Sequence, residues 1–354
     1  MTFLKNVWYV AARAAEFEQD MVSRTICNKA VVMFRKSDGT LAAVEDRCPH
    51  RFVPLSMGKR IGDNIQCGYH GLQFDGSGAC PVKPFEHGME RPDIRIASYP
   101  LIERHGVAWI WMGDPALADP AKIPDFSYLA EDPGVHALLA YSHIKANHMM
   151  IADNLLDLSH VHILHNLHDG SDYASFDNKV KQDGDTIWSM LYRPHYYLDD
   201  ARRQLYGFAS NDVEGQGHTR WNAPSVLAVY TAWWDHGKSL EEEGAVRAYN
   251  AHLLTPETEY TTHYFWGVTR NYAVGNTDMD DAMIAMVRNV FETEDGPMLE
   301  AQQRAMGEET DIFKLRPTIL KADTAGVMMR RYMKKRLRAE EAGEDVTEVA
   351  VAAE

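Results

Sequence analysis

Two short cysteine–histidine motifs constrain the fold of this chain more than any other feature of its sequence. The first is Cys48-Pro49-His50 and the second is Cys67-Gly68-Tyr69-His70, with sixteen residues between His50 and Cys67. Each motif offers one thiolate and one imidazole, and the apolar runs that flank them are typical of short strands. A single pair has an ordinary explanation as a buried cysteine beside a surface histidine. Two pairs in a chain of only four cysteines indicate one metal site held by two loops.

The two motifs are compatible with zinc and with an iron–sulfur cluster. Structural zinc sites use the same Cys₂His₂ set, but zinc fingers usually keep both cysteines in one turn and both histidines on one helix. Here each loop supplies one residue of each kind. A [2Fe–2S] cluster with two thiolates on one iron and two imidazoles on the other suits this distribution, and the neutral imidazoles raise its reduction potential. The motifs therefore predict an electron-transfer centre.

The remaining sequence indicates two domains. Residues 1–115 contain short apolar runs separated by Gly and Asp turns, which predicts an all-β domain. Three prolines between positions 115 and 124 are typical of a connection. Residues 116–340 are expected to form an α+β domain with an antiparallel sheet and flanking helices. The expected strands are 186–192, 226–234, 246–254 and 260–268, and the expected helices are 147–165, 279–306 and 318–339. Residues 341–354 are expected to be a disordered tail.

The charge of the chain excludes several classes of function. There are 36 Lys and Arg residues against 51 Asp and Glu residues, a formal net charge of −15. Such an acidic chain is a poor candidate for binding nucleic acid, because phosphate recognition depends on clustered basic side chains. We find no signal peptide and no apolar run near the roughly 18 residues of a membrane span. A cytoplasmic location without membrane or nucleic-acid partners is expected.

A second group of metal-ligating side chains lies in the predicted helix 147–165. Non-haem Fe(II) oxygenases hold iron with two histidines and one carboxylate and leave positions open for O₂ and substrate. His160 and His165 would be roughly 140° apart on a regular helix, so we expect the helix to end or to be distorted between them. The pairs His162/His165 and His165/His168 are spaced to chelate a metal unaided, and the residue pattern alone leaves these alternatives open.

Both groups resemble those of the Rieske non-haem iron oxygenases. Cys48-Pro49-His50-Arg51 and Cys67-Gly68-Tyr69-His70-Gly71 match the Rieske motif, and residues 74–78 are similar to the hairpin that follows it. The pattern Asp-x-x-His-x-x-x-x-His, here Asp157, His160 and His165, is similar to the iron-binding motif of that family. The resemblance runs from the Asn-Val-Trp-Tyr at residues 6–9 through residues 254–259 to the Glu294-Asp295 pair.

The resemblance implies a role for each of these residues. The ligands of a [2Fe–2S] cluster would be Cys48, His50, Cys67 and His70. His160 and His165 would bind a mononuclear iron, with Asp157 between cluster and iron, and His162 and His168 would be solvated or lie behind the ligands. The third ligand would be Asp295, with Glu292 and Glu294 as fallback ligands. Asn154, one turn before Asp157, is expected to line the site.

The resemblance is closest to the vanillate O-demethylase and dicamba monooxygenase group. It implies an N-terminal Rieske domain, a catalytic domain of the helix-grip type, a homotrimer, and a ferredoxin or flavin reductase that delivers NAD(P)H electrons. The implied reaction uses O₂ to hydroxylate the methyl carbon of a methoxylated aromatic acid, which releases formaldehyde and a phenol. The alternatives are hydroxylation of a ring or methyl group, a Rieske electron carrier, and a zinc-stabilised binding protein.

Three further features bear on substrate and partner. His252 occupies the place of a pocket histidine of the dicamba-type enzymes, so it is expected in the substrate pocket. Met286 stands where that group has a tryptophan, which favours an arene other than dicamba. An anionic substrate would need positive groups near the pocket, and the sequence does not identify them.

A basic run near the C-terminus is expected to be a solvated helix face or a docking site for an acidic ferredoxin. Its residues are Arg330, Arg331, Lys334, Lys335, Arg336 and Arg338.

Overall fold

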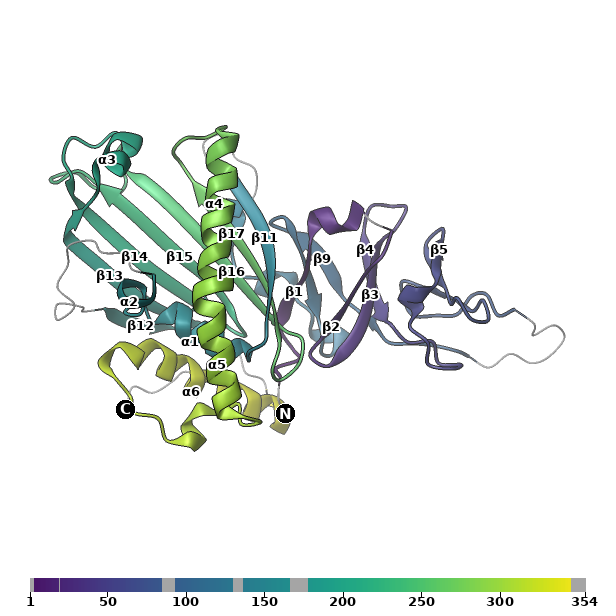
Figure 1. Ribbon diagram of the computed structural model, residues 1–354. Helices are drawn as coiled ribbons and strands as arrows, with labels where there is room; N and C mark the ends of the chain where they lie inside the picture. Colours follow the sequence, from purple (N-terminus) through teal and green to yellow (C-terminus); the bar gives the residue numbers. More distant parts are fainter. Residues whose placement is uncertain (1–2, 19, 85–92, 130–135, 166–177, 345–354) are drawn as a thin grey trace. The chain divides into compact units, whose positions relative to one another are not determined.

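The structure, a computed structural model, describes residues 3–18, 20–84, 93–129, 136–165 and 178–344 (Figure 1). The chain forms two compact units. The first comprises Phe3–Pro124 and Thr255–Glu259, and the second comprises Asp125–Leu254 and Tyr260–Glu354. The proline-containing stretch that we expected to be a connection groups with the first unit.

The described residues contain no helix that is both long enough and apolar enough to cross a membrane.

The described part of the first unit contains three small antiparallel sheets, and the prediction of an all-β domain is confirmed. One sheet has the order β1 (Trp8–Arg13), β10 (Val107–Trp111), β9 (Leu101–Arg104). The second has the order β2 (Val22–Ile26), β3 (Lys29–Arg35), β4 (Leu41–Glu45), β8 (Ser98–Tyr99). The third consists of β5 (Lys59–Ile61), β6 (Asn64–Gln66) and β7 (Gln73–Asp75). Short 3₁₀ turns lie at Ala14–Glu18, Leu55–Met57, Pro115–Leu117 and Pro120–Lys122.

Thr255–Glu259 belongs to the first unit because its backbone and side chains form hydrogen bonds with residues of that unit. The Thr255 hydroxyl donates to the carbonyl of Val10 at 2.7 Å, and the Cys27 N–H donates to the carbonyl of Pro256 at 2.8 Å. Both bonds join residues more than two hundred positions apart, so the sequence pattern alone did not reveal them.

The second unit is one seven-stranded antiparallel sheet with helices, and the α+β prediction is confirmed (Figure 1). Its order is β11 (His136–Ile144), β17 (Thr262–Arg270), β16 (Val246–Pro256), β15 (Val226–Trp234), β14 (Asp212–Asn222), β13 (Thr186–Tyr197), β12 (Lys179–Asp183). All nine residues of β17 are buried, as expected for an interior strand that is covered on both faces.

The helices of the second unit depart from the prediction in three places. The expected helix 147–165 is two helices, α1 (His148–Leu156) and α2 (Val161–Leu164), and the expected helix 318–339 begins at Thr324 as α6 (Thr324–Ala342). The expected helix 279–306 consists of α4 (Thr277–Asn289), the π-helix η7 (Val290–Asp295) and α5 (Gly296–Met306). Among the described residues, this unit also contains the short helix α3 (Asp200–Tyr206) and the 3₁₀ turns Ser127–Leu129, Ile312–Leu315 and Lys321–Asp323. Figure 1 shows α4 and α5 as one continuous rod across the sheet.

A tight turn follows the second cysteine–histidine loop. The Asp75 carboxylate accepts hydrogen bonds from the N–H and hydroxyl of Ser77 and from the N–H of Ala79. Gly78 ends the turn with φ at +80°, in the left-handed region that favours glycine. A Cβ added there would lie 2.2 Å from the carbonyl oxygen of Ile96, so both the conformation and the space require glycine.

The variant Gly78→Ala therefore tests the packing behind this turn. We predict a loss of about 2–4 kcal/mol in the free energy of unfolding, because left-handed strain of about 1 kcal/mol adds to overpacking of about 1–3 kcal/mol. Gly39→Ala is the matched control, since Gly39 has φ at +84° and nothing within 4 Å of the added Cβ. Urea titration of both intact variants is the measurement, and equal losses would contradict the packing argument.

Candidate metal centres

The two cysteine–histidine loops have the same backbone hydrogen bonds. In each, the cysteine N–H donates to the carbonyl five residues later, and the N–H of the fourth residue after the cysteine donates back to the cysteine carbonyl. These bonds join Cys48 with Val53 at 2.9 Å, Cys67 with Leu72 at 2.8 Å, Phe52 with Cys48 at 2.9 Å and Gly71 with Cys67 at 3.1 Å. Phe52 and Gly71, at equivalent places, both have positive φ, of +62° and +76°. The loops are therefore two copies of one local structure.

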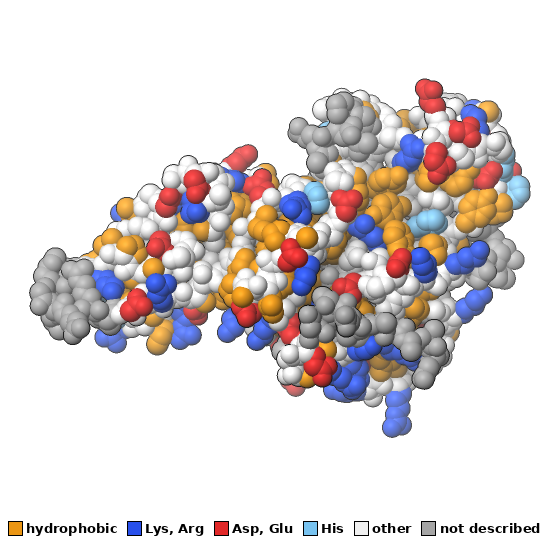
Figure 2. Space-filling model, turned by 180° about the vertical axis from the view of Figure 1, so that it is seen from behind, with side chains coloured by type: hydrophobic (Ala, Val, Ile, Leu, Met, Phe, Trp, Pro, Cys, Tyr) orange, Lys and Arg blue, Asp and Glu red, His pale blue; other side chains and the backbone are white. Residues whose placement is uncertain are grey.

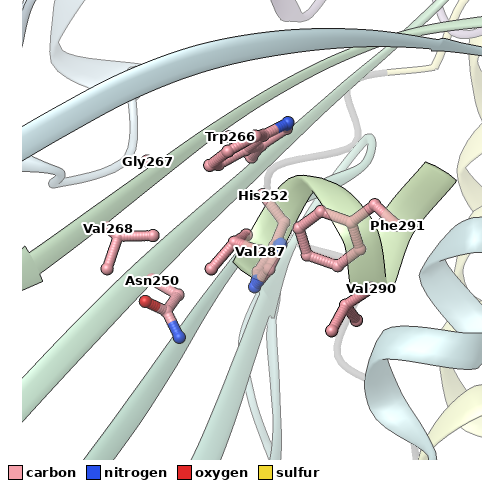
Figure 3. Close-up of a pocket in the computed structure, with 8 residues that line it drawn as sticks. All are labelled: Asn250, His252, Trp266, Gly267, Val268, Val287, Val290 and Phe291. Carbon is pink, nitrogen blue, oxygen red and sulfur yellow. The ribbon is translucent and has the colours of Figure 1, made fainter. Parts of the chain in front are cut away.

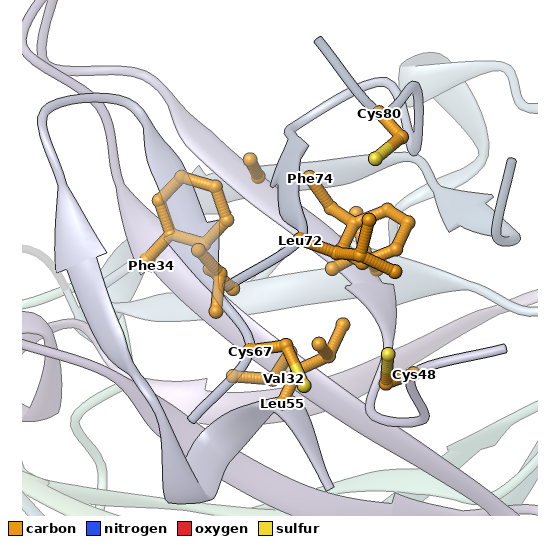
Figure 4. Close-up of a cluster of buried hydrophobic side chains, with 11 residues drawn as sticks. Val32, Phe34, Cys48, Leu55, Cys67, Leu72, Phe74 and Cys80 are labelled. Carbon is orange, nitrogen blue, oxygen red and sulfur yellow. The ribbon is translucent and has the colours of Figure 1, made fainter. Parts of the chain in front are cut away.

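The side chains of these loops fit a [2Fe–2S] cluster. Cys48 and Cys67 are 1% and 2% exposed at one edge of an apolar core, whereas Cys80 lies apart from them (Figure 4). The rings of His50 and His70 are 4.5 Å apart between centroids. His70 Nδ1 is buried and has no hydrogen-bond partner within the part of the chain that the structure describes. Burial raises the pKa of the Cys48 thiol, so a bound cation is the natural partner of its thiolate.

The segment that carries His160 and His165 is a single helical turn with interruptions on both sides. Helix α1 ends at Leu156, and Asp157 is its C-cap residue. Helix α2 is only four residues long, with His160 as its N-cap and His165 as its C-cap. We expected the interruption between the two histidines, but the structure places it before His160, since the residues between His160 and His165 form α2 and the N–H of His165 donates to the carbonyl of Val161. The His160 Nδ1–H donates to the carbonyl of Asp157, which fixes that ring against the break.

Asp295 brings the two histidines together. Its Oδ1 is 3.6 Å from His160 Nε2, and its Oδ2 is 3.5 Å from His165 Nε2. These separations are too long for hydrogen bonds. They are close to the spacing of neighbouring ligands on one metal, because atoms held at about 2.1 Å from a cation are about 3 to 3.5 Å apart. Asp295 is only 3% exposed, and such a buried carboxylate needs a cation or donors around it. The three side chains fit a two-histidine, one-carboxylate iron site.

The π-helix places the carboxylates of Glu294 and Asp295 against different ring nitrogens of His165. Glu294 Oε2 accepts from His165 Nδ1 at 2.7 Å, while Asp295 faces Nε2 of the same ring. Asn289 Nδ2 donates to the other oxygen of Glu294 at 3.1 Å. The N–H of Gly296 closes the wide turn on the carbonyl of Phe291. Short π-helical segments of this kind are frequent at functional sites.

The other candidate residues have separate positions. Glu292 accepts from the Ser142 hydroxyl at 2.8 Å and Glu294 faces the outer nitrogen of His165, so neither takes the place of Asp295 in this structure. Asn154 Nδ2 donates to Asp295 Oδ1 at 3.1 Å. The side chain of His162 and the whole of His168 lie outside the described residues.

Asp157 turns toward its own backbone. Its Oδ1 accepts from the N–H of Ser159 at 2.8 Å and from the Ser159 hydroxyl at 2.6 Å. These bonds hold the carboxylate at the break between α1 and α2. Its role toward a cluster histidine stays a prediction.

A cavity of about 150 Å³ lies between the sheet and the rod of helices (Figure 3). Its lining residues are Asn250, His252, Trp266, Gly267, Val268, Val287, Val290 and Phe291. A cavity of about this volume holds a benzene ring, so the space suits a single aromatic ring. Phe291 belongs to the same π-helix as Asp295, four residues before it, which connects the cavity wall to the metal ligands.

His252, which we expected in the substrate pocket, lines this cavity. It is 4% exposed, and its Nδ1 lies 2.6 Å from the Tyr264 hydroxyl. Burial lowers the pKa of His252 to about 3, so the ring is neutral at physiological pH. Burial also raises the pKa of Tyr264 well above its ordinary value, which keeps its hydroxyl proton in place.

Asn250 is a cavity residue that sequence reasoning missed. Its Oδ1 is buried and has no hydrogen-bond partner among the described residues. The signal was present in the alternation of β16, because Asn250 and His252 are two positions apart and therefore share a face of the sheet. No Lys or Arg is among the described residues that line the cavity.

The basic run near the C-terminus is divided between internal ion pairs and solvent. Arg330 is buried and pairs with Asp153 on α1 at 2.6 Å, and Arg336 pairs with Asp185 at 3.2 Å. Lys334 pairs with Asp311 at 3.2 Å. The expectation of a uniformly solvated face is therefore wrong for Arg330, whose charge holds α6 against α1.

Two family models match the chain. Residues 7–100 match the Rieske [2Fe–2S] domain, and residues 144–339 match the vanillate O-demethylase oxygenase C-terminal domain.

The sequence is similar to curated proteins along nearly its whole length. It is 35% identical to the oxygenase component of dicamba O-demethylase from Stenotrophomonas maltophilia, over 95% of this chain and 98% of that protein. It is 36% identical to the oxygenase component of chloroacetanilide N-alkylformylase from Rhizorhabdus wittichii, over 96% of this chain and 97% of that protein. The crystal structure of dicamba monooxygenase bound to 3,6-dichlorosalicylic acid superposes with a TM-score of 0.88 at 33% identity. It covers 97% of this chain and 100% of that one.

The contact between Glu294 and His165 generates a prediction for metal affinity. Glu294→Gln should weaken Fe(II) binding at the mononuclear site by about 10- to 100-fold, the usual effect of losing a carboxylate behind a ligating histidine. Glu292→Gln is the matched control, because it makes the same change in the same π-helix at an acid bonded to Ser142. Competition with a chromophoric chelator under anaerobic conditions measures both affinities. If the two variants bind iron equally well, Glu294 does not orient the ligand.

Proposed function

Since the chain belongs to the Rieske oxygenases whose C-terminal domain is of the vanillate O-demethylase type, we propose that it demethylates a single-ring methoxylated aromatic acid. As a member of this family it is the oxygenase component of a Rieske non-haem iron monooxygenase, served by a separate reductase. Its cofactors are a [2Fe–2S] cluster and a mononuclear iron. The proposed products are formaldehyde and a phenol.

The observation that carries this proposal is a cavity of the size of one aromatic ring. One π-helix supplies both a residue of the cavity wall and a metal ligand. Phe291 lines the cavity and Asp295 ends the same π-helix. When bound, the two cofactors supply electron transfer at the Cys/His loops and O₂ activation at the His160, His165 and Asp295 site. Phe291, Trp266 and the valines then hold the ring by apolar contact and exclude water from the reacting methyl group.

His252 orients the aromatic ring of the substrate by donating a hydrogen bond from its Nε2. With the Tyr264 hydroxyl donating to Nδ1 at 2.6 Å, the neutral imidazole carries its proton on Nε2. That N–H is free to donate to a phenol, ether or carboxylate oxygen of the substrate. Asn250 offers a second polar contact from the next position on the same face of β16.

We propose Arg270, which is not a lining residue of the cavity, as the cation that supports an acidic substrate. It lies two residues beyond Val268 on β17, so its side chain leaves the sheet on the cavity face. It is buried and paired with Asp280, and its Nε and Nη1 have no hydrogen-bond partner in the described ranges. A substrate carboxylate that extends from the cavity beyond Val268 would satisfy the Nε and Nη1 donors, which have no other partner among the described residues.

A second candidate function is oxidative N-dealkylation of a neutral anilide. It is favoured by the composition of the cavity, which has no Lys or Arg among its described lining residues. It is also favoured by the 36% identity with the chloroacetanilide N-alkylformylase component. Hydroxylation of a ring or methyl group uses the same cofactors and is the remaining oxygenase alternative. The electron-carrier alternative leaves the oxygenase domain at residues 144–339 without a role.

The assembly that we propose is the homotrimer implied by the family resemblance. In it, Asp157 of one subunit faces the cluster histidines of its neighbour, and a ferredoxin or flavin reductase supplies the electrons. The position of Asp157 at the break between two helices, beside His160, supports this bridging role.

A substrate panel tests the proposed reaction. The purified oxygenase, a matching reductase, NADH and O₂ are combined with methoxybenzoates, neutral methoxyarenes and N-alkyl anilides, and formaldehyde and phenol are quantified. We expect the acids to give the highest kcat/KM, with formaldehyde equal to substrate consumed, and Arg270→Met to lower kcat/KM for the acids only. Oxidation of the good substrates without formaldehyde would refute the demethylase and leave an oxygenase.

The bridging role of Asp157 has its own test. Asp157→Asn should keep both metal centres, as measured by iron content and cluster absorption, and should lose nearly all turnover in the same assay. Ser159→Ala is the matched control, because it removes the 2.6 Å hydroxyl contact and leaves the carboxylate in place. Normal turnover by Asp157→Asn would exclude the role.

A further inference from the structure

A second cluster of histidine and carboxylate side chains lies on the surface of the second unit. His195 is on β13, Asp212 begins β14, and His236 lies in the turn that follows β15. Their side chains are 62%, 30% and 40% exposed. Figure 2 shows histidine side chains next to acidic ones on the surface of the molecule. Neither the proposed reaction nor the two metal centres described above uses this cluster.

The donor atoms of the cluster are spaced like the ligands of one metal. His195 Nδ1 is 3.0 Å from Asp212 Oδ2, and His236 Nε2 is 3.2 Å from Asp212 Oδ1. All three donors lie within 4.8 Å of one another. Neighbouring ligands of a tetrahedral zinc ion with bonds of about 2.0–2.1 Å are about 3.3 Å apart. His195 Nδ1 is hydrogen-bonded to the Asp212 carboxylate, so a metal would take the place of that bond and would require only small movements of these side chains.

An irregularity in the sheet places His195 in the cluster. The pairing of β13 with β14 shifts between Arg193 and Tyr196, and regular pairing resumes with Tyr196 opposite Val213 and continues with Tyr197 opposite Asp212. His195 lies in this bulge. Bulges re-aim side chains that a regular strand would direct elsewhere, and here the result is that the imidazole faces the carboxylate of the neighbouring strand.

A carboxylate also lies behind one of the histidines. Glu214 Oε1 is 3.7 Å from His236 Nδ1, the nitrogen turned away from Asp212. Glu214 is itself held by the Tyr192 hydroxyl at 2.5 Å and the Gly237 N–H at 3.4 Å. Ligating histidines commonly have such a carboxylate on their second nitrogen. The candidate mononuclear iron site has the same arrangement, since Glu294 contacts the Nδ1 of His165.

We propose that His195, Asp212 and His236 bind one divalent transition-metal ion, Zn²⁺ being the species to test, with water at the remaining positions. Two imidazoles and one carboxylate suit zinc, nickel or copper and do not suit Mg²⁺ or Ca²⁺, which take oxygen ligands. The ion would join the end of the β13–β14 hairpin to the turn after β15. It is separate from the mononuclear iron and takes no part in oxygenation.

Equilibrium dialysis of the iron-loaded enzyme against micromolar Zn²⁺ tests this site, with zinc and iron counted in the same samples by mass spectrometry. Wild type should bind one zinc per chain more than His195→Ala or His236→Ala, with its iron content unchanged. Glu214→Gln should bind that zinc about 10-fold more weakly, as expected for loss of a carboxylate behind a ligand. His143→Ala, which removes another exposed histidine from β11, should behave like wild type.

Two outcomes would overturn the proposal. One is equal zinc uptake by wild type and by both histidine variants. The other is zinc uptake matched by loss of iron, which would mean that zinc replaces iron at the buried site. His236 lies in a turn outside the sheet ladder, so His236→Ala keeps the test valid even if His195→Ala fails to fold.

Discussion

The buried carboxylate of Asp295 is the constraint around which the second unit is organised. A carboxylate that is 3% exposed is costly unless donors or a cation surround it. Asn154 supplies one donor, and the two Nε2 atoms face the carboxylate at distances that leave room for a metal. The break between α1 and α2, the outward bonds of both Nδ1 atoms and the wide turn of η7 all bring these groups to one point.

Short-range patterns in the sequence predicted the parts of both centres that are local. The Cys48 and Cys67 loops each fit within a few residues, and the matching of their backbone bonds explains why the two motifs look alike. His160 and His165 are also close in sequence, but geometry alone did not separate them from His162 and His168. Only the family resemblance did so. The fold class followed from alternation and turn signals, which are local as well.

Features that depend on distant contacts or on weak patterns were not predicted. Strand β14 was missed because Gly215, Gly217 and its polar residues hide the alternation, although Val213 and Trp221 are buried. The π-helix is invisible in a periodicity search, since its residues continue a helical pattern. Asn154 and Asp295 are 141 positions apart, and no local rule connects them. The role of Glu294 behind His165 needs the ring orientation, which only the folded structure supplies.

The π-helix limits the insertions and deletions that this family can tolerate during evolution. Each residue of an α-helix advances the chain by about 100°, so deleting one residue from η7 would turn α5 by that angle relative to α4. Asp295 could then no longer face His160 and His165 while the buried face of α5 kept its packing. Substitutions within the segment change individual contacts, whereas a change of its length disrupts metal ligation and helix packing together. Insertions and deletions are therefore expected to be excluded from this stretch even where the surrounding sequence varies freely.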